Sequence, residues 1–268
     1  MACSSMANRE LCFDLTSGES DMMRRIWGIG LGLVLGAGVV GNADTVVLSA
    51  TQYNSIYSEN ASSANGDGDF MFAGVTRQAD VRRGFLQFDP AAELPAQVII
   101  QSVSLRLQVS RVAPSASSEP HSIHPVLQAW GSAASDPSGE EGVGIGALPN
   151  DATWSHRFFG SSAVWNVVGG DAGAAVATMD VSGTGPVDFS SSALRDSVQS
   201  WVDSPATNFG LQIRGNETDT FNATRFFSPK DDLFFPALTI EYTVVPEPAS
   251  VLLLLSGVLV CWVVRSTR

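Results

Sequence analysis

Ser102-Val103-Ser104-Leu105-Arg106-Leu107-Gln108-Val109 is the stretch that decides the fold of this chain. Apolar residues stand at every second position, and polar residues fill the positions between them. Successive side chains of a β-strand point to opposite faces of a sheet, so this alternation predicts a strand with one buried face and one wet face. The same alternation recurs at Leu211–Arg214 and at Leu238–Val244.

Further short strands are expected where brief apolar runs are bounded by Gly, Pro, Asn, Asp and Ser. These runs are Thr45–Ala50, Phe70–Ala73, Gly84–Phe88, Ile123–Trp130, Ala175–Val181 and Arg225–Phe227. One short helix is expected, because its apolar residues recur at helical spacing, with Ser191 or Ser192 as its cap. Its apolar stripe is Leu194, Val198, Trp201 and Val202. Many short strands without a βαβ rhythm predict an all-β fold, an antiparallel β-sandwich.

The segment 22–43 has the order of a secretory signal peptide. Arg24-Arg25 supplies a positive start, Ile26–Val40 an apolar core, and small residues precede a cleavage point after Ala43. The apolar core has 15 residues, which is short for a stable membrane span. We therefore expect an N-terminal signal helix and export of the chain.

Residues 1–21 are polar and lie upstream of that positive start. Met22 or Met23 would make a more usual beginning, so we expect a misassigned start. An extended n-region is the alternative. Residues 44–244 are then the exported domain, which is long enough for one hydrophobic core.

The exported domain has a distinctive composition. The three cysteines, Cys3, Cys12 and Cys261, all lie outside it, so it cannot use disulfides or thiolate zinc sites. Its 22 acidic and ten basic side chains give a net charge of −12. Such a surface disfavours nucleic acid and anionic membranes as partners, because both require neutralisation of phosphates.

The tail 245–268 combines three features. Pro246-Glu247-Pro248 forms a stiff start, an apolar run follows at 251–264, and Arg265 and Arg268 end the chain. As a helix the apolar run spans roughly 21 Å, which makes a marginal transmembrane helix across a core of roughly 30 Å. The terminal arginines favour the cytoplasmic side and stop transfer.

This order of Pro-Glu-Pro, short apolar helix and basic end resembles the bacterial PEP-CTERM sorting signal. The resemblance implies partners in the secretion machinery and an exosortase, a membrane-embedded cysteine transpeptidase or protease. It also implies an intermediate anchored in the inner membrane of a Gram-negative-type bacterium. The mature protein would then reach the cell surface or extracellular matrix. A plain C-terminal anchor is the alternative.

Five segments of the domain, in order, are similar to motifs of DNRLRE domains. They are Arg82–Asp89, Pro95–Leu107, Asp151–Trp154 followed by Trp165, Asn208–Arg214, and Pro236–Thr243. The name-giving segment, Asp80-Val81-Arg82-Arg83, matches only in part. The resemblance implies a jelly-roll β-sandwich of the carbohydrate-binding-module type, and some such domains bind acidic polysaccharide.

These features predict an exported, non-enzymatic surface or matrix protein linked to extracellular polysaccharide and biofilm. The alternative is a polysaccharide-binding module, with calcium assistance as a further hypothesis. A polysaccharide hydrolase or lyase is the third hypothesis. The sequence has no Gly-x-Ser-x-Gly elbow, and no pair of its many carboxylates stands out as a glycosidase pair.

Tryptophans are the candidate glycan contacts, because sugar rings stack on exposed indoles. Trp154 and Trp165 stand in loop-like sequence, which leaves them more open to ligand contact than the other two, with a core or loop-anchor role as the alternative. Trp130 and Trp201 stand in patterned elements and are expected in the core, where such rings contribute large burial energies.

The acidic loop Asn65-Gly66-Asp67-Gly68-Asp69 is the candidate calcium site, with Asp67 and Asp69 as ligands. No glutamate closes it at EF-hand spacing, and a tight turn is the alternative. His121 and His124 are expected on opposite faces of a strand, which argues against a shared metal. Gly131–Asn150 lacks an apolar period and is expected to be a disordered loop, with a functional loop as the alternative.

Overall fold

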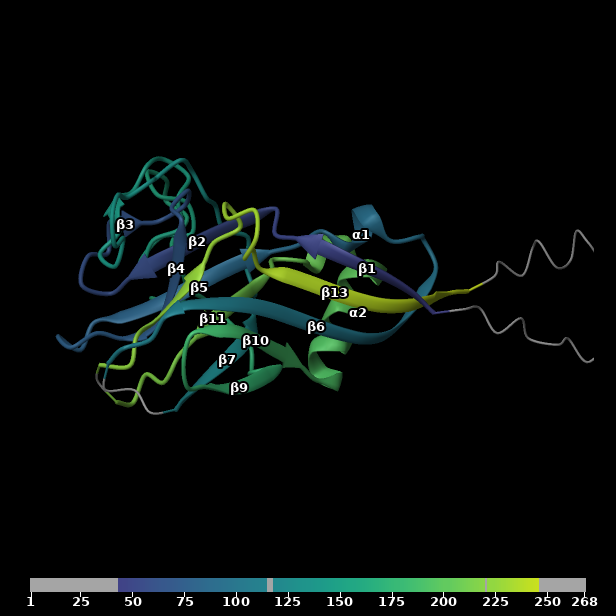
Figure 1. Ribbon diagram of the computed structural model, residues 1–268. Coiled ribbons are helices and arrows are strands. Elements are labelled where there is room, and N and C mark those ends of the chain that lie inside the picture. The colour runs from purple at the N-terminus through teal and green to yellow at the C-terminus, as the bar shows by residue number, and fades with distance from the viewer. Residues whose placement is uncertain (1–42, 115–117, 220, 246–268) are drawn as a thin grey trace, which may run out of the picture. The chain divides into compact units, whose positions relative to one another are not determined.

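The computed structural model describes residues 43–114, 118–219 and 221–245 (Figure 1). The predicted signal peptide, the Pro246-Glu247-Pro248 motif, the apolar run 251–264 and the terminal arginines lie outside these residues. Within the described part of the chain, no helix is long and apolar enough to cross a membrane.

The described chain is mostly β-structure, a large antiparallel sheet of 13 strands with two helices. The strands are β1 Asp44–Ser49, β2 Gln52–Tyr57, β3 Ser63–Ala64, β4 Phe70–Val75, β5 Val81–Gln87, β6 Val98–Arg111, β7 Glu119–Pro125, β8 Ile145–Gly146, β9 Ala177–Val181, β10 Gly185–Ser190, β11 Leu211–Arg214, β12 Thr224–Phe227 and β13 Ala237–Val244. The helices are α1 Pro90–Glu93 and α2 Ser192–Asp203, followed by a short 3-10 turn at Pro205–Thr207. The predicted antiparallel, β-rich fold is confirmed.

The sheet folds over on itself at β4. The main path of paired strands is β1-β13-β6-β12-β4-β5-β11-β7-β9, with β10 also on β6, β2 on β5, β3 on β2, and β8 on β3. Residues 70–73 of β4 pair with β12, whereas Gly74 and Val75 pair with β5. The strands before and after this fold therefore face each other across one apolar core, the inner core. Its fully buried members include Leu86, Leu105, Leu107, Ile123, Ile213, Phe226 and Ile240.

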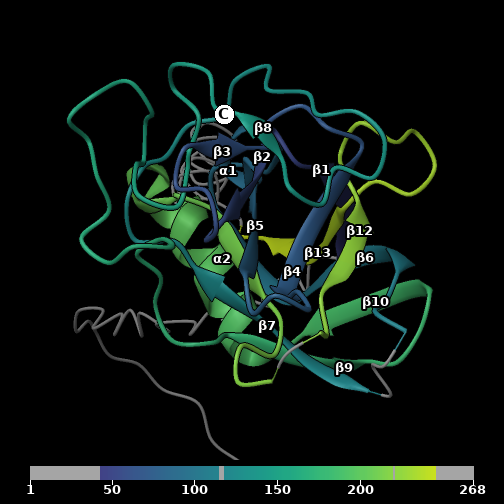
Figure 2. The same cartoon turned by 90° about the vertical axis from the view of Figure 1, so that its left-hand side faces the viewer.

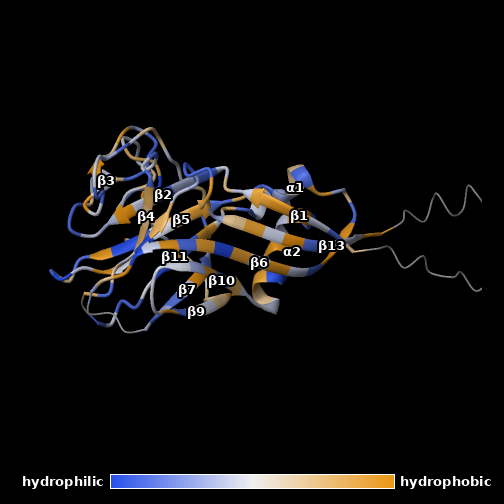
Figure 3. Cartoon of the chain, in the orientation of Figure 1, coloured by the Kyte–Doolittle hydropathy of each residue, from blue (hydrophilic) through white to orange (hydrophobic). Residues whose placement is uncertain are grey.

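Alternation along β6 is visible as orange and blue bands in Figure 3. The buried positions change phase between Ile100 and Val103. Ile100 pairs with Tyr242 and Ser102 with Glu241, so one extra residue of β6 bulges out between these pairs. Because side chains alternate with a period of two, the bulge returns the later apolar residues to the same face.

Helix α2 confirms the predicted apolar stripe. Leu194, Val198 and Trp201 are buried in the inner core, and the Ser191 hydroxyl accepts a hydrogen bond from Leu194 N at 2.9 Å as the helix cap. Gln199 accepts a bond from the backbone N–H of β6 at the bulge, at 2.8 Å. Helix α1 was not expected; it is a single turn that begins with proline.

Three expectations about strands need correction. The strand expected at Ile123–Trp130 lies earlier, as β7. β2 and β10 were not foreseen. The sequence of β2 looks polar because it contains Asn54 and Ser55, yet both side chains are buried. Gln212 of β11 was expected to face water, but it is fully buried. The reason is that the outer face of β2, β5 and β11 is covered.

The cover is the segment 126–173, here called the loop layer, which is drawn in teal over this part of the sheet in Figure 2. Beneath it lies a second cluster, the outer cluster, built around Phe85, whose ring centroid is 5.2 Å from that of Trp130 and 5.7 Å from that of Trp165. The prediction of disorder for Gly131–Asn150 is wrong, because Glu141 and Ser135 are buried and β8 pairs with β3.

The two ends of the described domain leave it side by side. Asp44 of β1 is paired with Tyr242 of β13, and Val244 is paired with Val98, the first residue of β6 (Figure 1). β6 has 14 residues, so at roughly 3.3 Å per residue its last residue, Arg111, lies roughly 43 Å away. The far end of β6 therefore points away from both chain ends.

Candidate binding site

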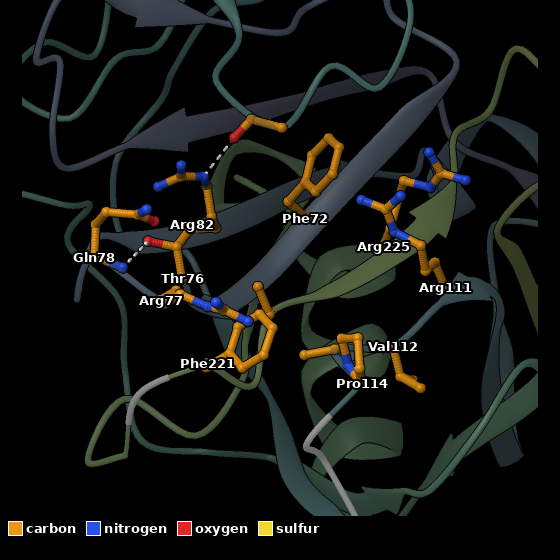
Figure 4. A pocket seen from close by; sticks show the side chains of 13 residues that line it. Phe72, Thr76, Arg77, Gln78, Arg82, Arg111, Val112, Pro114, Phe221 and Arg225 are labelled. Atoms are coloured by element: carbon orange, nitrogen blue, oxygen red, sulfur yellow. Dashed lines mark hydrogen bonds between the residues drawn. The ribbon is translucent and has the colours of Figure 1, made fainter.

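A cavity of about 460 Å³ opens at the far end of β6 (Figure 4). It lies between the hairpin that joins β4 to β5, the start of the segment after β6, β12, and the part of the loop layer near Gly142. Basic and aromatic side chains line it: Arg77, Arg82, Arg111, Arg225, Phe72 and Phe221. We call this cavity the arginine pocket.

The arginine pocket concentrates positive charge in an acidic domain. Four of the ten basic side chains between residues 44 and 244 line it, although the domain carries a net charge of −12. The four arginines come from three distant parts of the chain: Arg77 and Arg82 from the β4–β5 hairpin and the start of β5, Arg111 from the end of β6, and Arg225 from β12. Only the fold brings them together.

Arg82 has a structural role in the pocket wall. Its side chain is 3% exposed, and its guanidinium bonds both oxygens of Glu59, one of them at 2.7 Å. Its Nε donates to the carbonyl of Gly142 at 2.8 Å and its guanidinium lies 5.0 Å from the ring centroid of Tyr57. Burial raises the pKa of Glu59, and Arg82 partly offsets that effect. All of this fixes Arg82 in place.

Arg111 and Arg225 share one carboxylate oxygen. Glu140 Oε2 accepts a bond from Arg225 Nη1 at 2.9 Å and another from Arg111 Nη1. Arg225 is further held by Ser110 Oγ at 2.9 Å and lies 3.8 Å from the ring centroid of Phe70. Burial lowers the pKa of Arg225, Glu140 raises it, and the like charge of Arg111 lowers it.

Arg77 forms the opposite wall. Its guanidinium stacks 4.4 Å from the ring centroid of Phe221, and among the described residues no carboxylate lies within ion-pair distance of it. Phe221 has a φ of 61°, in the left-handed region that a bulky residue rarely adopts. Strain of this kind is often found at ligand sites.

The chemistry of the pocket favours binding of an anion. Four guanidiniums line the pocket and two carboxylates, those of Glu59 and Glu140, form ion pairs with them. The buried Glu141 also acts on Arg225, which still leaves an excess of positive charge among these groups. A guanidinium presents several donors in a planar fork that matches carboxylate geometry, and it stays protonated at all ordinary pH values. The aromatic rings beside it offer contact to an apolar ligand face.

No family model matches this chain, and no curated protein matches it. The arginine pocket was not found by sequence reasoning. The available signal was the heavy use of arginine in an acidic domain that has only one lysine, Lys230.

The two tryptophans expected to contact glycan lie in the outer cluster rather than in the arginine pocket. Trp165 is 4% exposed; its ring stacks on Phe85, and its Nε1 donates to Thr153 O at 2.9 Å. It therefore presents no ring face to a sugar in this structure. Trp154 is half-buried, with Arg83 5.0 Å from its ring centroid. The two do not form an exposed pair.

The candidate calcium ligands surround an ammonium group. Lys230 Nζ lies 3.9 Å from Asp67 Oδ2, 3.9 Å from Asp69 Oδ1 and 3.0 Å from Asp136 Oδ2. Asn65 closes the turn through a bond from its Nδ2 to Phe70 O at 3.0 Å. Among the described residues no group of three or more His, Cys, Asp or Glu is placed to hold a metal ion.

The remaining sequence candidates are structural. Trp130 and Trp201 are buried, as expected, in the outer cluster and the inner core. His121 is buried against Phe226, whereas His124 is only half-buried and bonds Gly173 O at 2.9 Å. The two histidines therefore lie on opposite faces of β7, as their spacing predicts.

Proposed function

We propose that this chain is an exported, non-enzymatic surface or matrix protein whose β-domain binds an acidic polysaccharide in the arginine pocket. The observation that carries the proposal is the convergence of four arginines on one cavity of a domain with a net charge of −12. The guanidinium of arginine stays protonated near neutral pH, so these walls suit recognition better than acid–base catalysis.

We further propose that the fold is of the jelly-roll, carbohydrate-binding-module type. Two observations support it: the sheet is antiparallel throughout, and it folds over so that its two parts share the inner core. The resemblance of five segments to DNRLRE domains points the same way. In this proposal the PEP-CTERM-like tail is recognised by an exosortase, and the anchored intermediate is released to the surface or matrix.

The position of the pocket suits a tethered protein. Val244, which leads into the tail, pairs with the first residue of β6, and the pocket is lined by Arg111, the last residue of the same strand. A domain held by its tail would thus present the pocket away from its point of attachment. A soluble matrix polymer could reach it there.

Binding can be tested on an array that holds uronate oligosaccharides, sulfated glycans and neutral glycans. We expect the full-length chain to bind uronates and not neutral sugars, with weaker binding at high salt because charges are screened. Arg77→Gln and Arg111→Gln should each weaken binding about fivefold or more. Arg106→Gln is the control, because Arg106 lies on β6 outside the arginine pocket and pairs with Asp188. Equal binding of neutral sugars, or no change in the pocket variants, would contradict the proposal.

Processing has its own test, mass spectrometry of the protein recovered from the surface fraction. We expect a mature N-terminus at Asp44 and no peptide from residues 261–268. Recovery of intact Cys261–Arg268 from that fraction would contradict exosortase processing. It would leave the binding proposal standing, since that proposal rests on described residues between Phe72 and Arg225.

A further inference from the structure

Glu140 holds a position in the arginine pocket that an outside ligand could take. Its Oε2 is the common acceptor for Arg111 Nη1 and Arg225 Nη1, yet the side chain is 69% exposed. It therefore reaches the two guanidiniums from the solvent side and is not packed into the protein. A carboxylate on a bound uronate would approach the pair from the same side.

The backbone next to Glu140 is clamped. Glu141 is buried and its carbonyl accepts a bond from the Tyr57 hydroxyl at 3.1 Å. One residue further, the carbonyl of Gly142 accepts from Arg82 Nε at 2.8 Å. Glu141 also has a φ of 57°, so the chain reverses there and the two adjacent glutamates point different ways. Motion of Glu140 can thus be confined to its side chain.

The two guanidiniums need an anion between them. The like charge of Arg111 contributes to lowering the pKa of Arg225, after burial, and Glu140 opposes both effects. Withdrawal of Glu140 without replacement would leave two like charges side by side. Withdrawal in exchange for a ligand carboxylate keeps the charge balance of the pair. Because Glu140 is already largely in water, its transfer to bulk solvent requires little change in solvation.

We propose that Glu140 is an internal occupant of the arginine pocket, displaced by the carboxylate of a bound uronate. This inference rests on the proposed function and deepens it. The exchange makes and breaks no covalent bond: the Glu140 side chain rotates into solvent, and the uronate oxygens accept the bonds from Arg111 and Arg225. Glu140 thereby sets the affinity of the site, and neutral sugars, which cannot replace its charge, are selected against.

The test compares Glu140→Gln with Glu241→Gln in the full-length chain. Glu241 lies exposed on β13 and accepts a bond from Ser102 Oγ at 2.7 Å, so both variants remove one surface charge. Calorimetric titration uses the uronate tetrasaccharide that binds best on the array. We expect Glu140→Gln to bind about 3–10-fold more tightly than the unaltered chain, and Glu241→Gln to bind equally. Glu140→Ala should show the same direction.

The outcomes separate this inference from the function beneath it. If the unaltered chain binds uronate and Arg111→Gln weakens it, but Glu140→Gln binds equally or less tightly, Glu140 is a structural latch and the inference is overturned while the function stands. If neither the unaltered chain nor Glu140→Gln binds any acidic glycan, the proposed function fails and the inference fails with it.

Discussion

The inner core and the outer cluster lie on opposite faces of the same strand. On β5, Leu86 points into the inner core and its neighbour Phe85 points into the outer cluster beneath the loop layer. The inner core is built from apolar residues on alternating positions of regular strands. The outer cluster is covered by the segment 126–173, whose only regular element is the two-residue strand β8.

Different forces hold the two regions. The inner core depends on burial of apolar surface, whereas the loop layer also depends on buried polar side chains that satisfy its backbone. Asp151 accepts bonds from Ala133 N at 2.7 Å and Leu148 N at 2.8 Å, and Asn54 donates to Ala152 O at 3.2 Å. Burial raises the pKa of Asp151, and these backbone bonds oppose the shift. A loop without periodicity can therefore still be well specified by buried polar side chains.

The largest expected effect on stability comes from truncating a β5 side chain that fills either the outer cluster or the inner core. We expect Phe85→Ala to cost about 3–5 kcal/mol and Leu86→Ala about 2–5 kcal/mol of unfolding free energy, because each leaves a cavity. Urea denaturation followed by tryptophan fluorescence measures both, since Trp165 reports on the outer cluster and Trp201 on the inner core. We expect a single transition in both variants. A separate early transition for Phe85→Ala would show that the loop layer unfolds on its own.

A smaller effect is expected from Glu141→Gln. Its Oε1 accepts from Asp69 N and its Oε2 from Phe70 N, each at 3.0 Å. Glutamine would place an N–H₂ group against one of these donors, and hydrogen bonds to a charged group contribute about 1.5–3 kcal/mol. We expect a loss of about 2 kcal/mol in urea denaturation. Glu140→Gln is the matched control on the adjacent residue and should cost under about 1 kcal/mol, because Glu140 is exposed. Equal losses would mean that the buried carboxylate does not hold the loop layer.

The apolar pattern predicted the inner core but not the outer cluster. Leu105 and Leu107 were correctly predicted to be buried, because apolar residues at every second position of a strand must all lie on the same face. β2 was missed since Asn54 and Ser55 look like turn residues. The loop layer covers Asn54, which donates to Ala152 O, whereas Ser55 faces the other side of the strand and accepts a bond from Phe72 N of β4. Trp165 was placed in a loop correctly, but a loop that packs on Phe85 buries its tryptophan.

The arginine pocket was out of reach of the sequence for a topological reason. Arg82 and Arg225 become neighbours only because β4 pairs with both β5 and β12. No local spacing in the sequence encodes that meeting. The predicted signal peptide and the predicted sorting tail are the opposite case, since each prediction rests on a short continuous segment of sequence.

A third expected effect concerns pH and the inner core. Burial lowers the pKa of His121, whereas its bond to Glu119 O and the charges of Glu119 and Asp180 oppose the shift. The unfolded chain, with a histidine pKa of about 6.5, therefore takes up a proton more readily than the folded one. This contribution is full above about pH 6.5 and is lost as the pH falls below it. The slope cannot exceed about 1.4 kcal/mol per pH unit for one proton.

Urea denaturation at a series of pH values from 5 to 7.5 measures this effect. His121→Gln should flatten the dependence of stability on pH, while His156→Gln in the loop layer serves as the matched control. A dependence unchanged by His121→Gln would place the sensitivity elsewhere, for instance at His124, whose pKa burial also lowers and which bonds Gly173 O of the loop layer. The result thus assigns acid sensitivity to one region or the other.

The smallest effect is expected on the exposed face of β6, which has no loop layer above it. Arg106 and Asp188 of β10 form a two-bond ion pair there, at 2.8 and 2.9 Å, with more than a third of each side chain exposed. Water and salt compete for both groups, so a double-mutant cycle with Arg106→Gln and Asp188→Asn should give a coupling of about 0.2–1 kcal/mol that shrinks as salt is added. Glu141 makes bonds of similar length, yet removal of its charge is expected to cost more. The difference then lies in the cover and not in the geometry of the bonds. A coupling as large as the cost of Glu141→Gln would contradict this explanation. It would show that polar contacts stabilise this domain equally with and without a loop layer above them.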